Sequence, residues 1–215
     1  MAERWATFDC YGTLIDWNGG ISRELERIFG SARGDELLAR YHELEPEVQR
    51  EDSGRSYRDV MADVLDRLGA PAEELDALGR ALPDWQPFPE VPAALEELRA
   101  GGWSLAILSN TDRDFIEASL RRIGVPFELA IVASEIGSYK PARRHWEEFR
   151  SRTGADGARH VHVGASLFHD VEPAKELGIP VVWINRLGEQ PTVLPTRQLP
   201  DLSALPETLD VLVPA

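Results

Sequence analysis

Residues 5–14 read WATFDCYGTL, and this stretch decides how the rest of the chain is expected to fold. The apolar run at residues 5–8 predicts a short buried β-strand. Asp9 follows it directly, and Gly12 gives the backbone the freedom for a sharp turn whose N–H groups face the carboxylate. Ligands of open α/β sheets bind at the carboxyl ends of the strands. Asp9 is therefore a candidate nucleophile, with a turn or helix-capping aspartate as the alternative.

Composition and charge narrow the class of protein. The chain has 215 residues, enough for one large domain or a core with an insert. Its 23 basic and 37 acidic residues give a net charge of -14, which argues against nucleic acid or a membrane surface as partner. The single cysteine, Cys10, excludes an internal disulfide and suits a reducing cytoplasm. No apolar run approaches about 20 residues and no signal peptide opens the chain, so we expect a cytoplasmic protein without a membrane span.

A helical insert is predicted for residues 17–83. Apolar residues recur there at helical spacing, and no strand signal appears. Pro46 is expected to end or kink the second helix of this insert. The glutamates of that helix are expected on a solvated face. Residues 1–16 and 84–215 are left to form the core.

Strands and helices alternate in the second part of the core. The predicted strands cover residues 103–108, 129–132, 161–163 and 181–184. This alternation predicts an α/β fold with a Rossmann-like parallel sheet and right-handed crossovers. The tail from Gly188 has no clear period, so no element is assigned to it.

Polar residues follow several of the predicted strands. These residues are Asp9, the pair Ser109 and Asn110, Lys140, and Asp170. A parallel sheet would gather them at one edge, where they would make a site. The insert leaves the core beside Asp9, so it would cover that edge as a cap and exclude water. A plain turn would also explain Ser109 and Asn110, and a lysine before a proline is normally a surface residue.

Four segments resemble the motifs of the haloacid dehalogenase superfamily, in the right order. They read DCYGTL at 9–14, ILSNT at 107–111, SYKP at 138–141 and GASLFHD at 164–170. The resemblance implies that Asp9 attacks the substrate and that water then releases the covalent intermediate. It also implies that Thr13 orients Asp9 by hydrogen bonding.

The other motif residues have implied roles as well. Ser109 and Asn110 would donate hydrogen bonds to the leaving group or to a substrate carboxylate. Lys140 would hold the Asp9 carboxylate and balance charge. Ser166 and Asp170 match the fourth motif.

The chain also departs from the best-studied dehalogenases of this superfamily. Leu167 stands where they have asparagine, and Trp146 stands where they have tyrosine. Where their cap presents an arginine, this chain has Glu43-Leu44-Glu45-Pro46. Possible replacements are Arg50, Arg55 and Arg58, and the sequence does not select among them. We expect Tyr11 and Trp146 to contact the substrate. The pair His160 and His162 is interpreted as structural strand histidines and not as metal ligands.

Tyr11 favours one chemistry over another. Phosphatases of the superfamily carry a second aspartate at this place, which protonates the departing alkoxide. A halide needs no proton. Ala165 also stands where magnesium-dependent members have an acidic residue, which leaves fewer carboxylates to bind a metal ion than Mg²⁺ prefers. The resemblance is closest to the type II 2-haloacid dehalogenase group, and it implies a cofactor-free hydrolysis of a small anionic 2-haloacid to the 2-hydroxy acid.

Two alternatives remain open. The first is a Mg²⁺-dependent phosphatase, with the ion held by Asp9, the Tyr11 carbonyl and Asp170. The second is a catalytically weak binding module, which is disfavoured because it would have no need for the full set of motif residues. A homodimer is possible by analogy with relatives.

Overall fold

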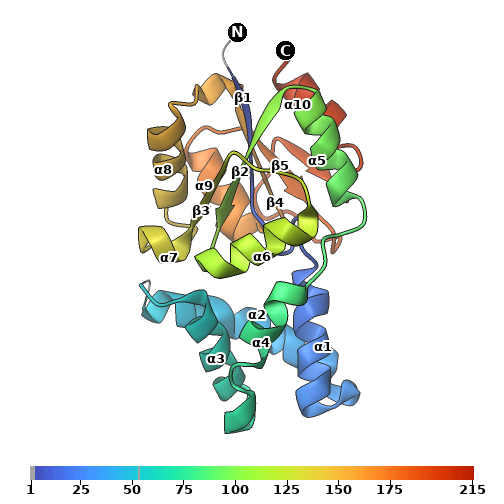
Figure 1. Cartoon of the computed structure of the whole chain (residues 1–215), viewed down its shortest axis with the longest axis vertical. Coiled ribbons are helices and arrows are strands. Elements are labelled where there is room, and N and C mark those ends of the chain that lie inside the picture. Colours follow the sequence, from blue (N-terminus) through green and yellow to red (C-terminus); the bar gives the residue numbers. More distant parts are fainter. Residues whose placement is uncertain (1–2, 53) are drawn as a thin grey trace.

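The computed structural model describes residues 3–52 and 54–215, and these form a parallel sheet above a group of helices (Figure 1). In the described residues six strands make one sheet, in the order β3-β2-β1-β4-β5-β6. The strands are β1 (Arg4–Phe8), β2 (Trp103–Ser109), β3 (Leu129–Val132), β4 (His160–Gly164), β5 (Val181–Ile184) and β6 (Arg197–Leu199). All neighbouring pairs run parallel. The predicted α/β class with a Rossmann-like sheet is confirmed.

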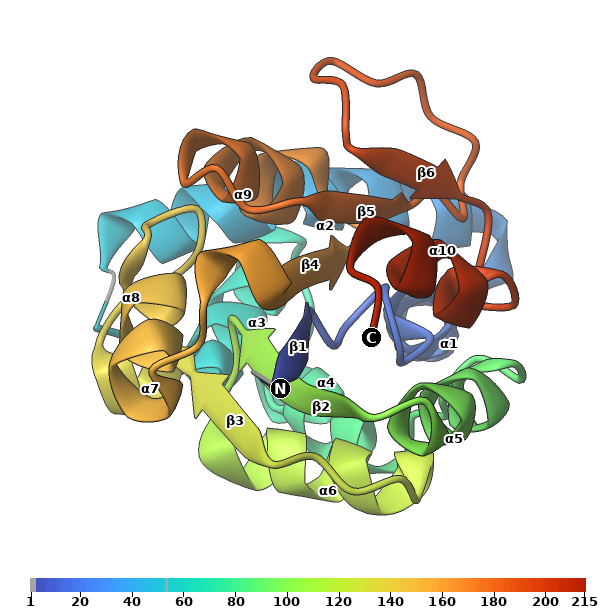
Figure 2. The ribbon, with the colours of Figure 1, turned by 90° about the horizontal axis from the view of Figure 1, so that it is seen from above.

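Helices cover both faces of the sheet (Figure 2). One face carries α5 (Val91–Ala100), α6 (Arg113–Ile123) and α10 (Leu205–Leu212), and the other carries α7 (Ala133–Ile136), α8 (Arg144–Thr153) and α9 (Glu172–Glu176). Successive residues of a strand point to opposite faces. On β1, Ala6 and Phe8 accordingly pack in one buried cluster and Trp5 in the other. The apolar runs of the sequence are thus strands buried on both sides.

The tail contains two elements that the sequence did not predict. β6 pairs with β5 at the edge of the sheet, and α10 packs against α5. β6 has three residues, all at least partly exposed, so it carries no apolar run that pattern analysis could detect. Leu205 and Leu209 bury one side of α10.

Residues 17–83 form the helices below the sheet in Figure 1. They are α1 (Trp17–Phe29), α2 (Gly34–Glu51), α3 (Tyr57–Arg67) and α4 (Ala77–Ala81), and we call residues 17–83 the helical segment. Its described residues contain no strand, as predicted. None of the helices in the described ranges is long and apolar enough to cross a membrane.

Pro46 does not end its helix, so that part of the prediction is wrong. α2 continues past it to Glu51. A proline removes one backbone N–H, here the donor to the carbonyl of His42. Leu44 and Val48 are buried on either side of Pro46, and this packing holds the helix together across it.

The carboxyl ends of the central strands point toward the helical segment, while the start of β1 and the C-terminus lie at the far end of the molecule (Figure 1). β1 pairs with β2 on one side and with β4 on the other. The segments that follow these three strands therefore meet at one place between sheet and helices.

Candidate active site

A cavity of about 440 Å³ lies between the carboxyl edge of the sheet and the helical segment. From the core it is lined by Asp9, Tyr11, Ser109, Asn110, Lys140, Ser166, Phe168, His169 and Asp170. From the helical segment it is lined by Trp17, His42, Glu45, Pro46, Gln49 and Tyr57. Most residues predicted from the strand ends thus meet in one hollow.

Asp9 lies at the end of β1, where the chain turns sharply through Gly12 with φ +86°. Thr13 stands behind it, fully buried, and its Oγ1 donates to Asp9 Oδ2 at 2.9 Å. The backbone N–H of Ala165 donates to the same Oγ1 at 3.0 Å. Because the hydroxyl accepts from Ala165, its own hydrogen is directed toward Asp9. This is the orienting contact expected of Thr13.

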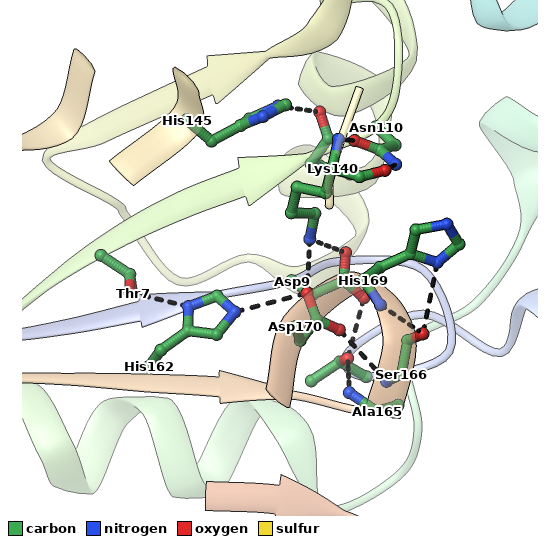
Figure 3. A network of polar contacts seen from close by, with 12 residues as sticks. Thr7, Asp9, Asn110, Lys140, His145, His162, Ala165, Ser166, His169 and Asp170 are labelled. Carbon is green, nitrogen blue, oxygen red and sulfur yellow. Dashed lines mark hydrogen bonds and ion pairs between the residues drawn. The ribbon is translucent and has the colours of Figure 1, made fainter. Parts of the chain in front are cut away.

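Lys140 lies between two carboxylates and is 2% exposed. Its Nζ is 2.9 Å from Asp9 Oδ1 and 2.7 Å from Asp170 Oδ1 (Figure 3). Asn110 fixes the backbone of this lysine, since its Oδ1 accepts from Lys140 N at 2.6 Å and its Nδ2 donates to Lys140 O at 3.0 Å. Asn110 therefore has a clear part in placing Lys140, and its contact with a substrate stays a prediction.

Ser109 and Ser166 both line the cavity. His145 Nε2 donates to the carbonyl of Ser109 at 3.1 Å, which holds the end of β2. Ser166 Oγ accepts from the backbone N–H of His169 at 3.0 Å and lies 3.2 Å from His169 Nδ1 (Figure 3). Ser166 thus shapes the turn in front of Asp170.

Asp170 sits in a single π-helical turn, Leu167–Val171, directly after β4. Its Oδ2 accepts from Ser166 N at 3.1 Å, and its Oδ1 is bonded to Lys140 and, at 3.3 Å, to His162 Nε2. Gly164 permits this packing, because a Cβ there would lie 2.4 Å from Asp170 Cγ. The fully buried carboxylate therefore has partners for both oxygens.

The three charged groups shift one another's pKa values. Burial raises the pKa of Asp9, and the Lys140 ammonium only partly offsets this. Burial also acts to raise the pKa of Asp170, but Lys140 and His162 outweigh it and hold that pKa below its usual value. For Lys140, the two carboxylates outweigh burial and raise its pKa. Lys140 and Asp170 are thus a stable ion pair, and Asp9 is the carboxylate that is easier to protonate.

The predicted pair His160 and His162 lies on one face of β4, and both side chains bind Thr7. Thr7 Oγ1 is 2.9 Å from His162 Nδ1 (Figure 3) and 2.8 Å from His160 Nε2. Burial lowers the pKa of both histidines, that of His160 to about 3, so both are neutral. A neutral His162 that donates from Nε2 to Asp170 must accept from Thr7 at Nδ1. The sequence analysis did not anticipate this link to Asp170.

Trp146 lies away from the cavity, which corrects its expected contact with the substrate. It is 2% exposed and packs in the core on α8. Its ring lies edge-on against that of His162, with centroids 5.1 Å apart. Phe149, three residues later, is buried in the same cluster, so both residues belong to the face of α8 that packs on the sheet.

Tyr11 lines the cavity with its ring, but its hydroxyl points to α6. Tyr11 OH lies 3.0 Å from Ser119 Oγ. The ring stacks on Tyr57, with centroids 6.4 Å apart. The side chain that stands in place of a second aspartate is therefore a wall residue.

None of the arginines proposed as replacements lines the cavity. Arg50 Nε donates to the backbone carbonyl of Pro46 in an exposed position. Arg55 pairs with Asp63, and Arg58 pairs with Asp114. The guanidinium groups of all three are thus engaged outside the cavity, and that of Arg58 also lies over the ring of Phe115 on the core helix α6.

The residues that the helical segment contributes to the cavity were not predicted from the sequence. Glu45 is the clearest, because the glutamates of α2 were expected on a solvated face and Glu45 is 8% exposed. Glu43 and Glu47 are exposed as expected. The signal was present in the spacing, since position 45 follows the buried Tyr41 by four residues and so shares its helical face.

Within the described ranges, no group of three or more His, Cys, Asp or Glu side chains has an arrangement that would hold a metal ion. The donors themselves are poorly suited to Mg²⁺. The Lys140 ammonium already occupies the space between Asp9 and Asp170, at 2.9 and 2.7 Å. A divalent cation held by the same two oxygens would meet this positive charge at close range.

Comparison with known proteins places this architecture in a family. A haloacid dehalogenase-like hydrolase model matches residues 4–178. The (S)-2-haloacid dehalogenase of Pseudomonas sp. (strain YL) is 31% identical over 191 residues, covering 84% of this chain and 82% of that protein. The crystal structure of the L-2-haloacid dehalogenase RSc1362 is similar with a TM-score of 0.86 and 24% identity, covering 98% of this chain and all of that one.

A second solved structure, the L-2-haloacid dehalogenase from Xanthobacter autotrophicus, has a TM-score of 0.82 at 21% identity and covers 99% of this chain and 100% of its own. These structural likenesses show a common fold. The family match extends over most of the chain and includes the segments that carry Asp9, Lys140 and Asp170. The chain belongs to the haloacid dehalogenase-like hydrolases.

Proposed function

We propose that this hydrolase converts a small 2-haloacid into the 2-hydroxy acid, with Asp9 as the nucleophile. The observation that carries the proposal is the bridge Asp9–Lys140–Asp170, which keeps a carboxylate in place at the wall of a small cavity. Tyr11 supplies no second carboxyl group beside it. The name of the Pseudomonas relative, an (S)-2-haloacid dehalogenase, supports the same reaction.

The reaction has two steps. An oxygen of Asp9 attacks C2 of the substrate, a C–O bond forms, and the C–halogen bond breaks with both electrons leaving on the halide. Water then adds to the Asp9 carbonyl of the ester, and the ester C–O bond cleaves to release the 2-hydroxy acid. The sum consumes one water and releases one halide and one proton. Asp9 is restored for the next turnover.

Lys140 and Thr13 support Asp9 through this cycle. Their contacts hold one oxygen each, at 2.9 Å, so the carboxylate is oriented before the substrate arrives. When Asp9 becomes a neutral ester, Lys140 keeps Asp170 as its counter-charge. Because Lys140 provides the positive charge, the proposed reaction uses no cofactor.

The helical segment of residues 17–83 acts, in this proposal, as a cap domain over the site. It contributes six of the residues that line the cavity. Apolar and aromatic side chains such as Trp17 and Tyr57 exclude bulk water from the nucleophile. The buried free Cys10 is consistent with a reducing compartment such as the cytoplasm.

A substrate screen tests the proposal. Purified protein is incubated with 2-chloropropionate, 2-bromopropionate and a panel of phosphate esters, each with EDTA and with added Mg²⁺, and free halide and free phosphate are measured. We expect halide release from the 2-haloacids that EDTA does not abolish. Phosphate release that is lost on chelation would support the phosphatase in place of the dehalogenase.

Asp9→Asn tests the nucleophile. The amide has nearly the same volume but is a poor nucleophile, so the rate should fall on the order of a thousandfold or more. Asp66→Asn, an exposed change on α3, is the matched control. In a single turnover of the wild type in H₂¹⁸O, label should enter Asp9 and the first product should remain unlabelled. Label in the first product would show that water attacks the substrate directly.

A further inference from the structure

Glu45 is a carboxyl group inside the cavity for which none of the four motifs gives a role. It lies on α2, is buried, and lines the same hollow as Asp9. Gln49 Nε2 donates to Glu45 Oε1 at 3.0 Å. Glu45 comes from α2 of the helical segment and Asp9 from the end of β1 in the sheet, so the two carboxyl groups enter the cavity from its two different sides. Both carboxyl groups therefore border the space that a small substrate would enter.

The cavity offers little positive charge to a leaving halide. Among the described residues that line it, Lys140 is the single Lys or Arg side chain, and it is already bound to Asp9 and Asp170. Burial lowers the pKa of His42, and it lowers that of His169 to about 4. Both imidazoles are therefore neutral at neutral pH. The departing anion must find a neutral hydrogen-bond donor.

Titratable groups face Glu45 from several elements. They are Tyr41 on its own helix, Tyr57 on α3, Tyr139 from the segment before Lys140, and Asp9 after β1. Burial raises the pKa values of the three phenols, so they are neutral in the same range. Burial also raises the pKa of Glu45 to about 7, although a hydrogen bond from Tyr57 opposes this rise. Glu45 is thus partly protonated at neutral pH.

We propose that protonated Glu45 is a catalytic residue that donates a hydrogen bond to the departing halide. The inference rests on the proposed hydrolysis of 2-haloacids. A displacement at carbon expels the leaving group on the side opposite the nucleophile, and Glu45 enters the cavity from the helical segment whereas Asp9 enters it from the sheet.

The step balances without proton transfer. The C–O bond to Asp9 forms while the C–halogen bond breaks, and the electron pair of that bond leaves with the halide. HCl and HBr are much stronger acids than a carboxylic acid, so the proton stays on Glu45 and is shared with the halide only as a hydrogen bond. An ionised Glu45 has no proton to donate and repels the halide. The first step therefore depends on one proton at Glu45.

The pH dependence of three proteins tests this role. We measure kcat/KM for 2-chloropropionate from about pH 5 to about pH 9 in the wild type, Glu45→Gln and Glu47→Gln. The wild-type value should fall about tenfold for each pH unit above about pH 7. Glutamine keeps the volume and an N–H donor but does not ionise, so Glu45→Gln should show no such fall. Glu47 is exposed two residues away, and its variant should follow the wild type.

The identity of the halide gives a second measurement. Glu45→Ala removes the donor, and we expect kcat for 2-chloropropionate to drop about tenfold to a hundredfold, the range for a hydrogen bond to a charged group. The drop for 2-bromopropionate should be smaller, because bromide is the weaker hydrogen-bond acceptor. Equal losses for the two substrates would contradict contact with the leaving group.

Other results would overturn the inference. One is a fall above neutral pH that persists in Glu45→Gln, and another is no fall in the wild type. If Glu45→Gln does not fold, the test is instead the inhibition of the wild type by bromide, measured as a function of pH. A bromide inhibition constant that is independent of pH would count against Glu45. A wild type that hydrolyses no 2-haloacid at any pH would overturn the proposed function itself, and this inference with it.

Discussion

Lys140→Met separates the charge of Lys140 from its bulk. Methionine fills much of the space of the lysine stem but carries no charge, so the variant leaves Asp9 and Asp170 facing each other inside the protein. The lysine is 2% exposed and bridges the two carboxylates at 2.9 and 2.7 Å. Removing one partner of such a buried pair costs about 3 to 5 kcal/mol in the free energy of unfolding. We expect a loss of this size at neutral pH.

The loss should depend on pH. In the wild type, the lowered pKa of Asp170 contributes stability that is present above the usual carboxyl range and disappears as the pH falls through the lowered value. In Lys140→Met the ammonium is gone, so burial raises the pKa of both aspartates against weaker opposition, from Thr13 at Asp9 and from His162 at Asp170. The variant therefore gains stability on acidification, because it takes up protons that the unfolded chain still lacks. The difference between the two proteins should shrink toward acid pH.

The assay is urea unfolding followed by circular dichroism at neutral and at mildly acid pH. Lys175→Met is the control, since Lys175 is exposed and contacts only the backbone carbonyl of Leu194. The double variant Lys140→Met, Asp170→Asn should recover part of the stability, because it removes one of the two facing charges. The rate should fall about a hundredfold to a thousandfold, as expected when one electrostatic contact with the reacting group is lost. A loss below about 1 kcal/mol, typical of a surface pair, would refute this account of Lys140.

Two further predictions concern Thr13 and Glu45. Thr13→Val should lower kcat with little change of fold, since it removes the hydrogen bond that orients Asp9. It should also lower the free energy of unfolding by about 1 to 3 kcal/mol, because the N–H of Ala165 loses its partner. Thr13→Ser, which keeps the hydroxyl, is the control in unfolding and rate assays. Glu45 should destabilise the fold as the pH rises, because its folded pKa of about 7 lies above the ordinary glutamate pKa of 4.5. Its contribution to the free energy of unfolding, about 3 kcal/mol, is complete below about pH 4.5 and is lost as the pH rises through about 7. In urea unfolding, the stabilities of the wild type and Glu45→Gln should therefore converge in acid and diverge above neutral pH.

The sequence alone was enough to predict five of the six described strands and most of the core side of the site. Parallel strands buried on both faces appear as short apolar runs, and the polar residue that ends each run must lie at the ligand-binding edge. Asp9 directly follows β1, whereas Lys140 follows β3 only after the short helix α7; although they are 131 positions apart, both lie at this edge. The contact distances and the protonation states depend on packing, and no sequence rule gives them.

The helical side of the site was not predicted for a different reason. A helical pattern shows which residues share a face, but it does not show whether a charged residue on the buried face opens into a cavity. Glu45 was therefore grouped with the exposed Glu43 and Glu47. For Trp146 the error is the reverse: it stands where the dehalogenases have a tyrosine, but it lies on the buried helix face that it shares with Phe149.

A series of hydrogen bonds runs from Asp170 through His162 and Thr7 to His160. It explains what Asp170 is suited to do. These polar groups lie under α8, where Trp146 and Phe149 close off the solvent, so each needs a partner within the protein. Thr7 on β1 pairs in register with His162 on β4, and the two side chains meet at 2.9 Å. This series of hydrogen bonds ends on Asp170 Oδ1, the oxygen that also binds Lys140. A carboxylate with these donors and a pKa below its usual value is a weak base. Its geometry favours holding the ammonium of Lys140 against Asp9 over accepting a proton from water.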